Sequence, residues 1–399
     1  MPVNEAVNKM EGKVRATYLR RGLTALADPV RLLTARFRIQ SLVWTVFFVL
    51  YAGFTVYLFF AWVNPSLDGH TDQHIAADSA TYIHLASVLQ GKTFDPTVVP
   101  LLLKFPNTLL GPTLVAYVVE STPFTMLADY AIFLLAVLLL RKSINFSVFG
   151  FVGLLLINAT TTISLVSVNK EIIDLLVVAI FIFGLKKRYY SLVLFSFLLA
   201  IFNRYEVALV LLLFLLFTSK LNPLRQKRAL MLTLLTLALS ISLPIFASNA
   251  LNEQFEMATN GHTIALLDSL EMHFLYIFAV IPKIAENLFA EIINFQKLQA
   301  YLDFQDIANT YIVFFNNLAT LIVVAYLCIK RTFSIKNDLV YLALIGWIVM
   351  AIALIVQPRY FYLSYILLCL RATQKDVAES RVILGEPAGL PKREEAALA

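Results

Sequence analysis

The chain of 399 residues is too apolar for an ordinary soluble protein, because 59% of its residues are hydrophobic and only 15% are charged. Its mean hydropathy is +0.77, and apolar stretches near the roughly 20 residues that a spanning helix needs recur along it, which predicts an all-α, polytopic integral membrane protein. This composition excludes a large soluble catalytic domain. The net charge of +6 does not indicate a nucleic-acid partner, because the Lys and Arg residues cluster beside the ends of apolar stretches, where they set membrane orientation.

The N-terminal part of the sequence predicts a basic arm followed by a first span. Residues 1–40 carry eight Lys or Arg and three acids, without the apolar core of a cleaved signal peptide, and are expected on the cytoplasmic side. The span over residues 41–63 then leads outward by the positive-inside rule, so that residues 64–107 form a first outer loop. Residues 98–121 contain Pro100, Pro106 and Pro112 and are expected to skirt or re-enter the membrane.

Apolar stretches alternate with Lys/Arg clusters through the rest of a transmembrane domain that covers residues 41–371, giving about ten crossings. Residues 145–168 are read as one outward span, whereas residues 189–219 are read as two short helices that meet at a polar corner, 203–206. Residues 249–310, with eight acids and two Lys, form a second outer loop with interfacial helices, including one near residues 273–281. The tail, 372–399, is expected to be mobile and cytoplasmic, so that both ends of the chain lie on the cytoplasmic side. The expected location of the protein is the plasma (inner) membrane, as an integral, multi-pass protein.

The candidate catalytic residue is Asp78 in the first outer loop. All five histidines fall in the two outer loops, so any active site is expected on that face. Asp78, Tyr82 and Leu85 share one face of a predicted helix by their three-and-four spacing. Asp78 has two interpretations: it is the N-cap of this helix, or it is a general base that takes a proton from a substrate hydroxyl.

The same loop contains, before Asp78, two Asp and two His residues at alternate positions, a pattern that suits metal binding. Carboxylate and imidazole groups are the ligand types for a divalent ion, so a metal cofactor is a possible addition to the site. The Gly-containing polar stretch is equally typical of a solvated loop. The alternating residues are Asp68, His70, Asp72 and His74.

A second set of charges lies where apolar stretches are broken near their predicted outer ends. Ionisable groups are costly there unless they are paired or used. Either opposite charges pair and seal the bundle, or the cations form a pocket for the phosphate of a lipid-linked substrate. Arg204 and Arg359 are expected to converge on one such pocket, and a separation beyond about 15 Å, more than a Debye length, would refute this. The candidate substrate-binding residues are Lys170, Glu171, Arg204, Glu206 and Arg359, with Tyr82.

Taken together, these short motifs resemble the GT-C class of membrane glycosyltransferases and the related polysaccharide polymerases. The matching segments are Asp78 to Ala86, Asn169-Lys170-Glu171, Arg204-Tyr205-Glu206 and Pro358-Arg359-Tyr360. The resemblance implies an acidic base in the first outer loop, which corresponds to Asp78, with Asp68 or Asp72 as weaker candidates; a paired acidic dipeptide common in that loop is absent.

The activity implied by the resemblance is transfer of a sugar from a polyprenyl-phosphate-linked donor to a glycan or lipid acceptor on the outer face. Lys170, Arg204 and Arg359 would then stabilise the departing phosphate. No nucleotide-binding loop occurs in the sequence, which agrees with a lipid-linked donor. A transporter or flippase of a lipid-linked glycan is the alternative from another class, and a non-enzymatic assembly subunit is a third.

Overall fold

A computed structural model describes residues 42–63, 77–119, 122–255, 269–270, 273–293, 307–352 and 358–375. Within these ranges every regular element is a helix, accompanied by one isolated bridge between Phe146 and Gln374. The predicted all-α fold class is therefore confirmed for the described residues. The basic arm 1–40, most of the tail 372–399 and large parts of both predicted outer loops lie outside them.

The chain divides into two units, Met1–Tyr57 and Leu58–Ala399. In the first unit the described part is a helix that begins at Leu42. The second unit contains, in chain order, η1 (Phe59–Val63), α3 (Ala77–Leu89), α4 (Val98–Lys104), α5 (Pro106–Val119), α6 (Thr122–Ser143), α7 (Val148–Ile157), α8 (Ala159–Val166), α9 (Lys170–Lys187), α10 (Tyr190–Asn203), α11 (Tyr205–Thr218), α12 (Arg228–Phe255), α14 (Tyr276–Ile293), α16 (Ile307–Ile329), α17 (Asp338–Met350), η2 (Pro358–Phe361) and α18 (Tyr362–Thr373).

Among the described residues, two helices are long and apolar enough to cross a membrane, over Leu42–Ala61 and Phe124–Ser143. A third candidate is the pair α7 and α8, which is bent by 88°. The stretch 145–168 is thus not the single straight span expected from the sequence. The reason is Asn158, which adopts an extended backbone and accepts a hydrogen bond from the Thr160 amide through Oδ1 at 3.0 Å, so that α8 starts anew.

One other break agrees with the sequence. The corner expected at 203–206 is the junction of α10 and α11, where Arg204 leaves the helical conformation with φ −160° and ψ 103°. Residues 98–119 form two short helices, α4 and α5, with Phe105 between them and Pro106 at the first position of α5. Proline suits this position because it lacks the amide hydrogen that a first helical turn leaves unused.

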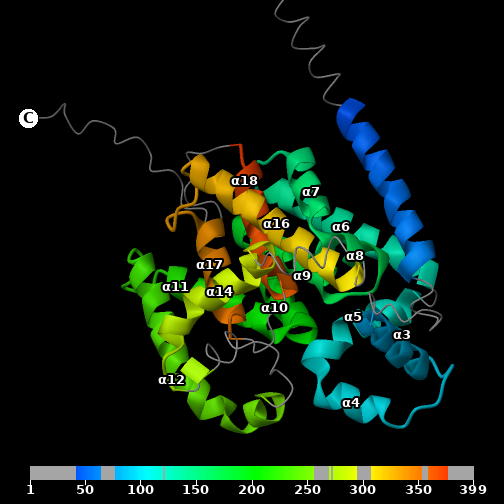
Figure 1. Ribbon diagram of the computed structural model, residues 1–399, viewed down its shortest axis with the longest axis horizontal. Coiled ribbons are helices and arrows are strands. Elements are labelled where there is room, and N and C mark those ends of the chain that lie inside the picture. The colour runs from blue at the N-terminus through cyan, green and yellow to red at the C-terminus, as the bar shows by residue number, and fades with distance from the viewer. Residues whose placement is uncertain are drawn as a thin grey trace, which may run out of the picture. The chain divides into compact units, whose positions relative to one another are not determined.

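The interior of the second unit is formed by α9, α17 and α18, whose side chains are mostly buried (Figure 1). Helix α9 packs against α6 and α10, and α18 packs against α17 and α7. The α17–α18 contact is close at Gly346, where a Cβ atom would lie 2.6 Å from Ser364 Oγ. The first turn of α9 carries Lys170 and Glu171, and η2, which directly precedes α18, carries Arg359. These buried helices thus position part of the candidate site.

The helix expected near residues 273–281 begins at Tyr276 and continues to Ile293 as α14. It packs against α12 and α16, and the buried Tyr276 hydroxyl donates to the Ile348 carbonyl. This helix is therefore part of the packed bundle along its first turns.

Candidate functional site

Helix α3 presents Asp78 from its first turn, where a negative charge is favourable beside unpaired amide groups. The turn is anchored because the Ser79 hydroxyl donates to the Val168 carbonyl at 2.7 Å. Tyr82, one turn further on, is buried against Ala116 and Val168. The predicted face of α3 is thus the buried one, and it fixes where the Asp78 carboxylate lies.

Tyr82 was a candidate for substrate binding, and the structure makes it a packing residue beside the site. Burial, together with the negative charges of Asp78 and Glu171, raises the pKa of the Tyr82 hydroxyl above its ordinary value. The hydroxyl therefore remains protonated at neutral pH and is available only as a hydrogen-bond donor or a neutral acceptor.

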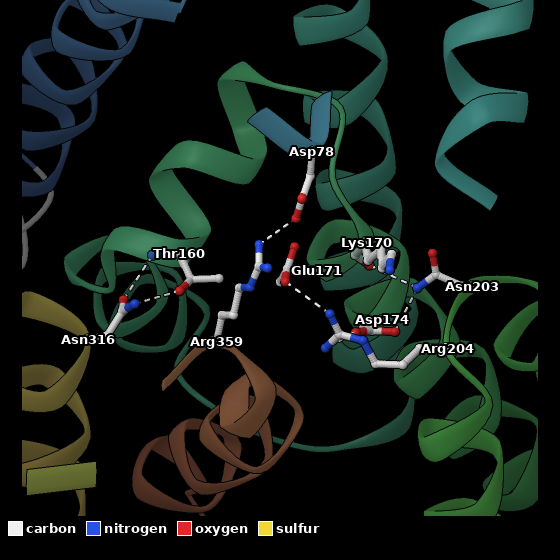
Figure 2. Close-up of polar contacts among 9 residues, drawn as sticks. All are labelled: Asp78, Thr160, Lys170, Glu171, Asp174, Asn203, Arg204, Asn316 and Arg359. Atoms are coloured by element: carbon white, nitrogen blue, oxygen red, sulfur yellow. Dashed lines mark hydrogen bonds and ion pairs between the residues drawn. The ribbon is translucent and has the colours of Figure 1, made fainter. Parts of the chain in front are cut away.

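Arg359 reaches Asp78 from η2, although 281 residues separate them. Arg359 Nη1 donates to Asp78 Oδ2 at 2.6 Å, and the two side chains are 34% and 43% exposed (Figure 2). The sequence showed no acidic residue near Arg359 along the chain, and the tertiary structure supplies one from α3. Asp78 is therefore part of a half-exposed ion pair. It lies within the first turn of α3 and not at the position before the helix, so it is not the N-cap.

Arg204 lies in a buried part of the same cluster. Its Nη2 donates to Glu171 Oε1 at 3.1 Å, and its Nη1 is 3.3 Å from Asp174 Oδ2. The Asn203 amide completes the arrangement by donating to Asp174 Oδ1 at 2.7 Å and to the Lys170 carbonyl at 3.0 Å. The Arg204 side chain is only 8% exposed, so these contacts seal the α9–α10 junction, as the pairing interpretation expected.

The two arginines share an aromatic neighbour, Tyr360. The guanidinium carbon of Arg204 is 5.6 Å from the ring centroid, and that of Arg359 is 5.9 Å from it. The two carbons can therefore be no further apart than the sum of these distances, which is below the limit set from the sequence. Figure 2 shows the Glu171 carboxylate between the two guanidinium groups.

The site has no surplus of positive charge. Glu206 adds a further negative charge close to Arg204. The pocket expected from the sequence was cationic, but its positive groups are matched by acids from α3 and α9. The cations of the site are Lys170, Arg204 and Arg359. The acids are Asp78, Glu171 and Asp174, with Glu206 as a fourth.

Asp174 and Asn203 were not among the predicted site residues. Asp174 is fully buried in α9, and an acid within an apolar stretch is costly enough that its position three residues after Glu171 is a usable signal. A second polar junction could not be found from the sequence: Asn316 of α16 accepts from the Thr160 amide at 2.9 Å and donates to the Thr160 hydroxyl at 2.7 Å. It joins α16 to the first turn of α8, beside Arg359 in the view of Figure 2.

The proposed metal ligands, Asp68, His70, Asp72 and His74, lie outside the described residues. Within the described ranges no group of three or more His, Cys, Asp or Glu side chains is arranged to hold a metal ion. His84, on the exposed side of α3, instead pairs with Asp95 at 3.2 Å. Hydrogen bonds from the Thr97 hydroxyl and amide hold the pKa of Asp95 below its usual value.

No described protein family matches this sequence, and neither a curated protein nor a solved structure shows significant similarity to it.

Proposed function

We propose that this protein is a membrane glycosyltransferase that moves a sugar from a polyprenyl-phosphate-linked donor to a glycan or lipid acceptor. The observation that carries the proposal is the half-exposed pair of Asp78 and Arg359, which lies beside the buried ion pairs of Arg204 with Glu171 and Asp174. A carboxylate beside a guanidinium group, both open to solvent, supplies a proton acceptor and a phosphate ligand within one site.

The proposal places the protein in the plasma (inner) membrane with about ten crossings and both ends in the cytoplasm. It is supported by the apolar composition and by the helices over Leu42–Ala61 and Phe124–Ser143. The Lys and Arg clusters after α6, α9 and α16 would lie inside. Asp78, Arg204 and Arg359 would then face the opposite side, where lipid-linked sugars would reach them from the bilayer.

Charge balance gives the order of events. Arg359 is already paired, so a donor phosphate must compete with Asp78 for its guanidinium group. When the phosphate takes this contact, the Asp78 carboxylate loses its cation and is repelled by the new anion, which makes it a stronger proton acceptor. Donor binding would in this way produce the base.

In the transfer step the acceptor hydroxyl oxygen attacks the anomeric carbon of the donor sugar. Its proton passes to Asp78, the new glycosidic C–O bond forms, and the bond between the anomeric carbon and the phosphate oxygen breaks with its electron pair. Arg359 stabilises the negative charge that develops on the leaving polyprenyl phosphate or diphosphate. The proton on Asp78 is then released to water, which restores the ion pair.

The test is the Asp78→Asn variant in reconstituted vesicles, with release of the polyprenyl phosphate product from a panel of lipid-linked sugars as the measurement. General-base catalysis contributes typically 10²–10⁴-fold, so a loss of about this size is expected. Asn accepts a hydrogen bond from Arg359 almost as well, so the thermal unfolding midpoint should change little. Asp95→Asn, a partly exposed acid on the loop after α3 that pairs with His84, is the matched control and should retain activity. Full turnover in Asp78→Asn would exclude the base.

Transport of lipid-linked glycans is the second candidate function, because two helical segments of this protein are interrupted at polar residues, Asn158 and Arg204. Broken helices of this kind line substrate paths in transporters. The two functions separate in the same vesicle assay. Transport moves the intact glycolipid across the bilayer, whereas transfer releases the lipid phosphate from it.

A further inference from the structure

Tyr360 occupies an unusual place between two positively charged groups. Both guanidinium carbons lie within 6 Å of its ring centroid, at 5.6 Å for Arg204 and 5.9 Å for Arg359. This is the range in which a cation is attracted to an aromatic ring.

The two arginines differ in how they are held. Arg204 is buried and has contacts with two carboxylates of α9, so its position is fixed by the interior. Arg359 is one-third exposed, and the one hydrogen bond described for it goes to a carboxylate that is itself 43% exposed. Exposed ion pairs of this kind hold geometry weakly, because water competes for both partners. A contact that does not depend on Asp78 therefore holds Arg359 more firmly, in addition to the nearby charge of Glu171.

The ring of Tyr360 is suited to provide that contact. Like charges repel, so two guanidinium groups remain close only where acids and a polarisable ring lie around them. Here Glu171 lies between the two cations (Figure 2), and the ring touches both. Tyr360 directly follows Arg359 in η2, so a ring fixed against Arg204 also fixes the backbone that carries Arg359.

We infer that Tyr360 is a positioning residue that ties the exposed Arg359 to the buried Arg204, and that its ring rather than its hydroxyl does so. For its effect on ligand binding this inference rests on the proposed function. The consequence is that Arg359 keeps its place when a lipid phosphate displaces Asp78, so that part of the phosphate site exists before the ligand arrives.

The first test measures binding of a polyprenyl phosphate to the full-length protein in nanodiscs, through the thermal unfolding midpoint at rising lipid concentration. The uncharged polyprenol of the same chain length is titrated in parallel. Tyr360→Phe keeps the ring and should bind the phosphate within about twofold of the unmodified protein. Tyr360→Leu removes the ring and should weaken binding by about 5- to 30-fold, which corresponds to roughly 1–2 kcal/mol.

The effect of Tyr360→Leu should be confined to the phosphate, because a general loss of packing would weaken the polyprenol equally. Equal binding of the phosphate by Tyr360→Leu and by the unmodified protein would overturn the inference. Equal weakening in the Phe and Leu variants would also overturn it, because the hydroxyl would then be the active group.

A second test needs no ligand and stands apart from the proposed function. The unfolding midpoints of Tyr360→Leu, Arg359→Met and the double variant form a double-mutant cycle, with Tyr360→Phe in place of Leu as the control cycle. A ring that holds Arg359 predicts a non-additive shift of about 1 °C or more with Leu and additivity with Phe. Additivity in the Leu cycle would overturn the inference. If the unmodified protein does not bind the polyprenyl phosphate while the Leu cycle is non-additive, the proposed function fails and the positioning role of Tyr360 stands.

Discussion

Replacement of the two arginines by methionine should separate a structural cation from a functional one. Arg204→Met leaves Glu171 and Asp174 buried without their cation, at 1% and 0% exposure. Breaking a buried pair in this way costs about 3–5 kcal/mol, on the order of 4–6 °C in the unfolding midpoint of a chain of this length. Arg359→Met breaks a pair whose members are 34% and 43% exposed, and such pairs contribute about 0–1 kcal/mol. The second variant should therefore fold normally and yet fail to bind a lipid phosphate.

The measurement is the thermal unfolding of both variants in detergent, together with their expression in membranes. A rescue variant tests the cause: Arg204→Met combined with Glu171→Gln and Asp174→Asn removes the two buried carboxylate charges that Arg204 pairs with, and should recover most of the lost stability. If Arg204→Met alone is as stable as the unmodified protein, Arg204 is not held by these acids and the sealed cluster does not exist in solution. If Arg359→Met unfolds as early as Arg204→Met, the distinction between the two arginines is wrong.

Three further outcomes are expected. Arg359→Lys keeps the charge and loses the planar fork, so activity should fall markedly, and Arg359→Ala should nearly eliminate it; full activity of the Lys variant in the vesicle assay would reduce Arg359 to an interfacial anchor. Gly111→Ala would place a Cβ atom 2.9 Å from Asn203 Oδ1 and disturb the amide that holds Asp174. This change should lower the stability measured by thermal unfolding by about 1–3 kcal/mol. In the control variant Gly53→Ala the added Cβ atom has no atom within 4 Å, so the stability should not fall. Cysteines introduced at His70 and His262 should react with a membrane-impermeant thiol reagent on intact cells in a Cys328→Ser background, and labelling of a cysteine at Lys187 would invert the proposed topology.

The sequence determined the class of structure and the local breaks in it, because both depend on patterns over a few residues. Apolar stretches of spanning length require helices, since a helix satisfies its own backbone in lipid. The polar residues around Arg204 marked the end of α10 for the same reason, because a charged group interrupts an apolar helix.

The 88° bend between α7 and α8 shows where this local reasoning stops. Asn158 and the threonines that follow it at 160–162 are uncharged polar residues within an apolar stretch, which a straight span tolerates. At the same bend Asn316, from a helix more than 150 residues later, binds the Thr160 amide and hydroxyl. Since no pattern in the sequence links the two residues, the bend followed only from the packed structure.

The site divides in the same way. The sequence identified Asp78, Arg204 and Arg359 individually, because an ionisable group in an apolar chain is costly enough to stand out. It did not determine their partners, since a partner is set by which helices pack together. The structure gave Arg359 the carboxylate of Asp78 and gave Arg204 the acids of α9, while Tyr360 contacts both arginines. Burial then decided their roles: water reaches the first pair and leaves it exchangeable, whereas the second is enclosed and must stay paired to be stable.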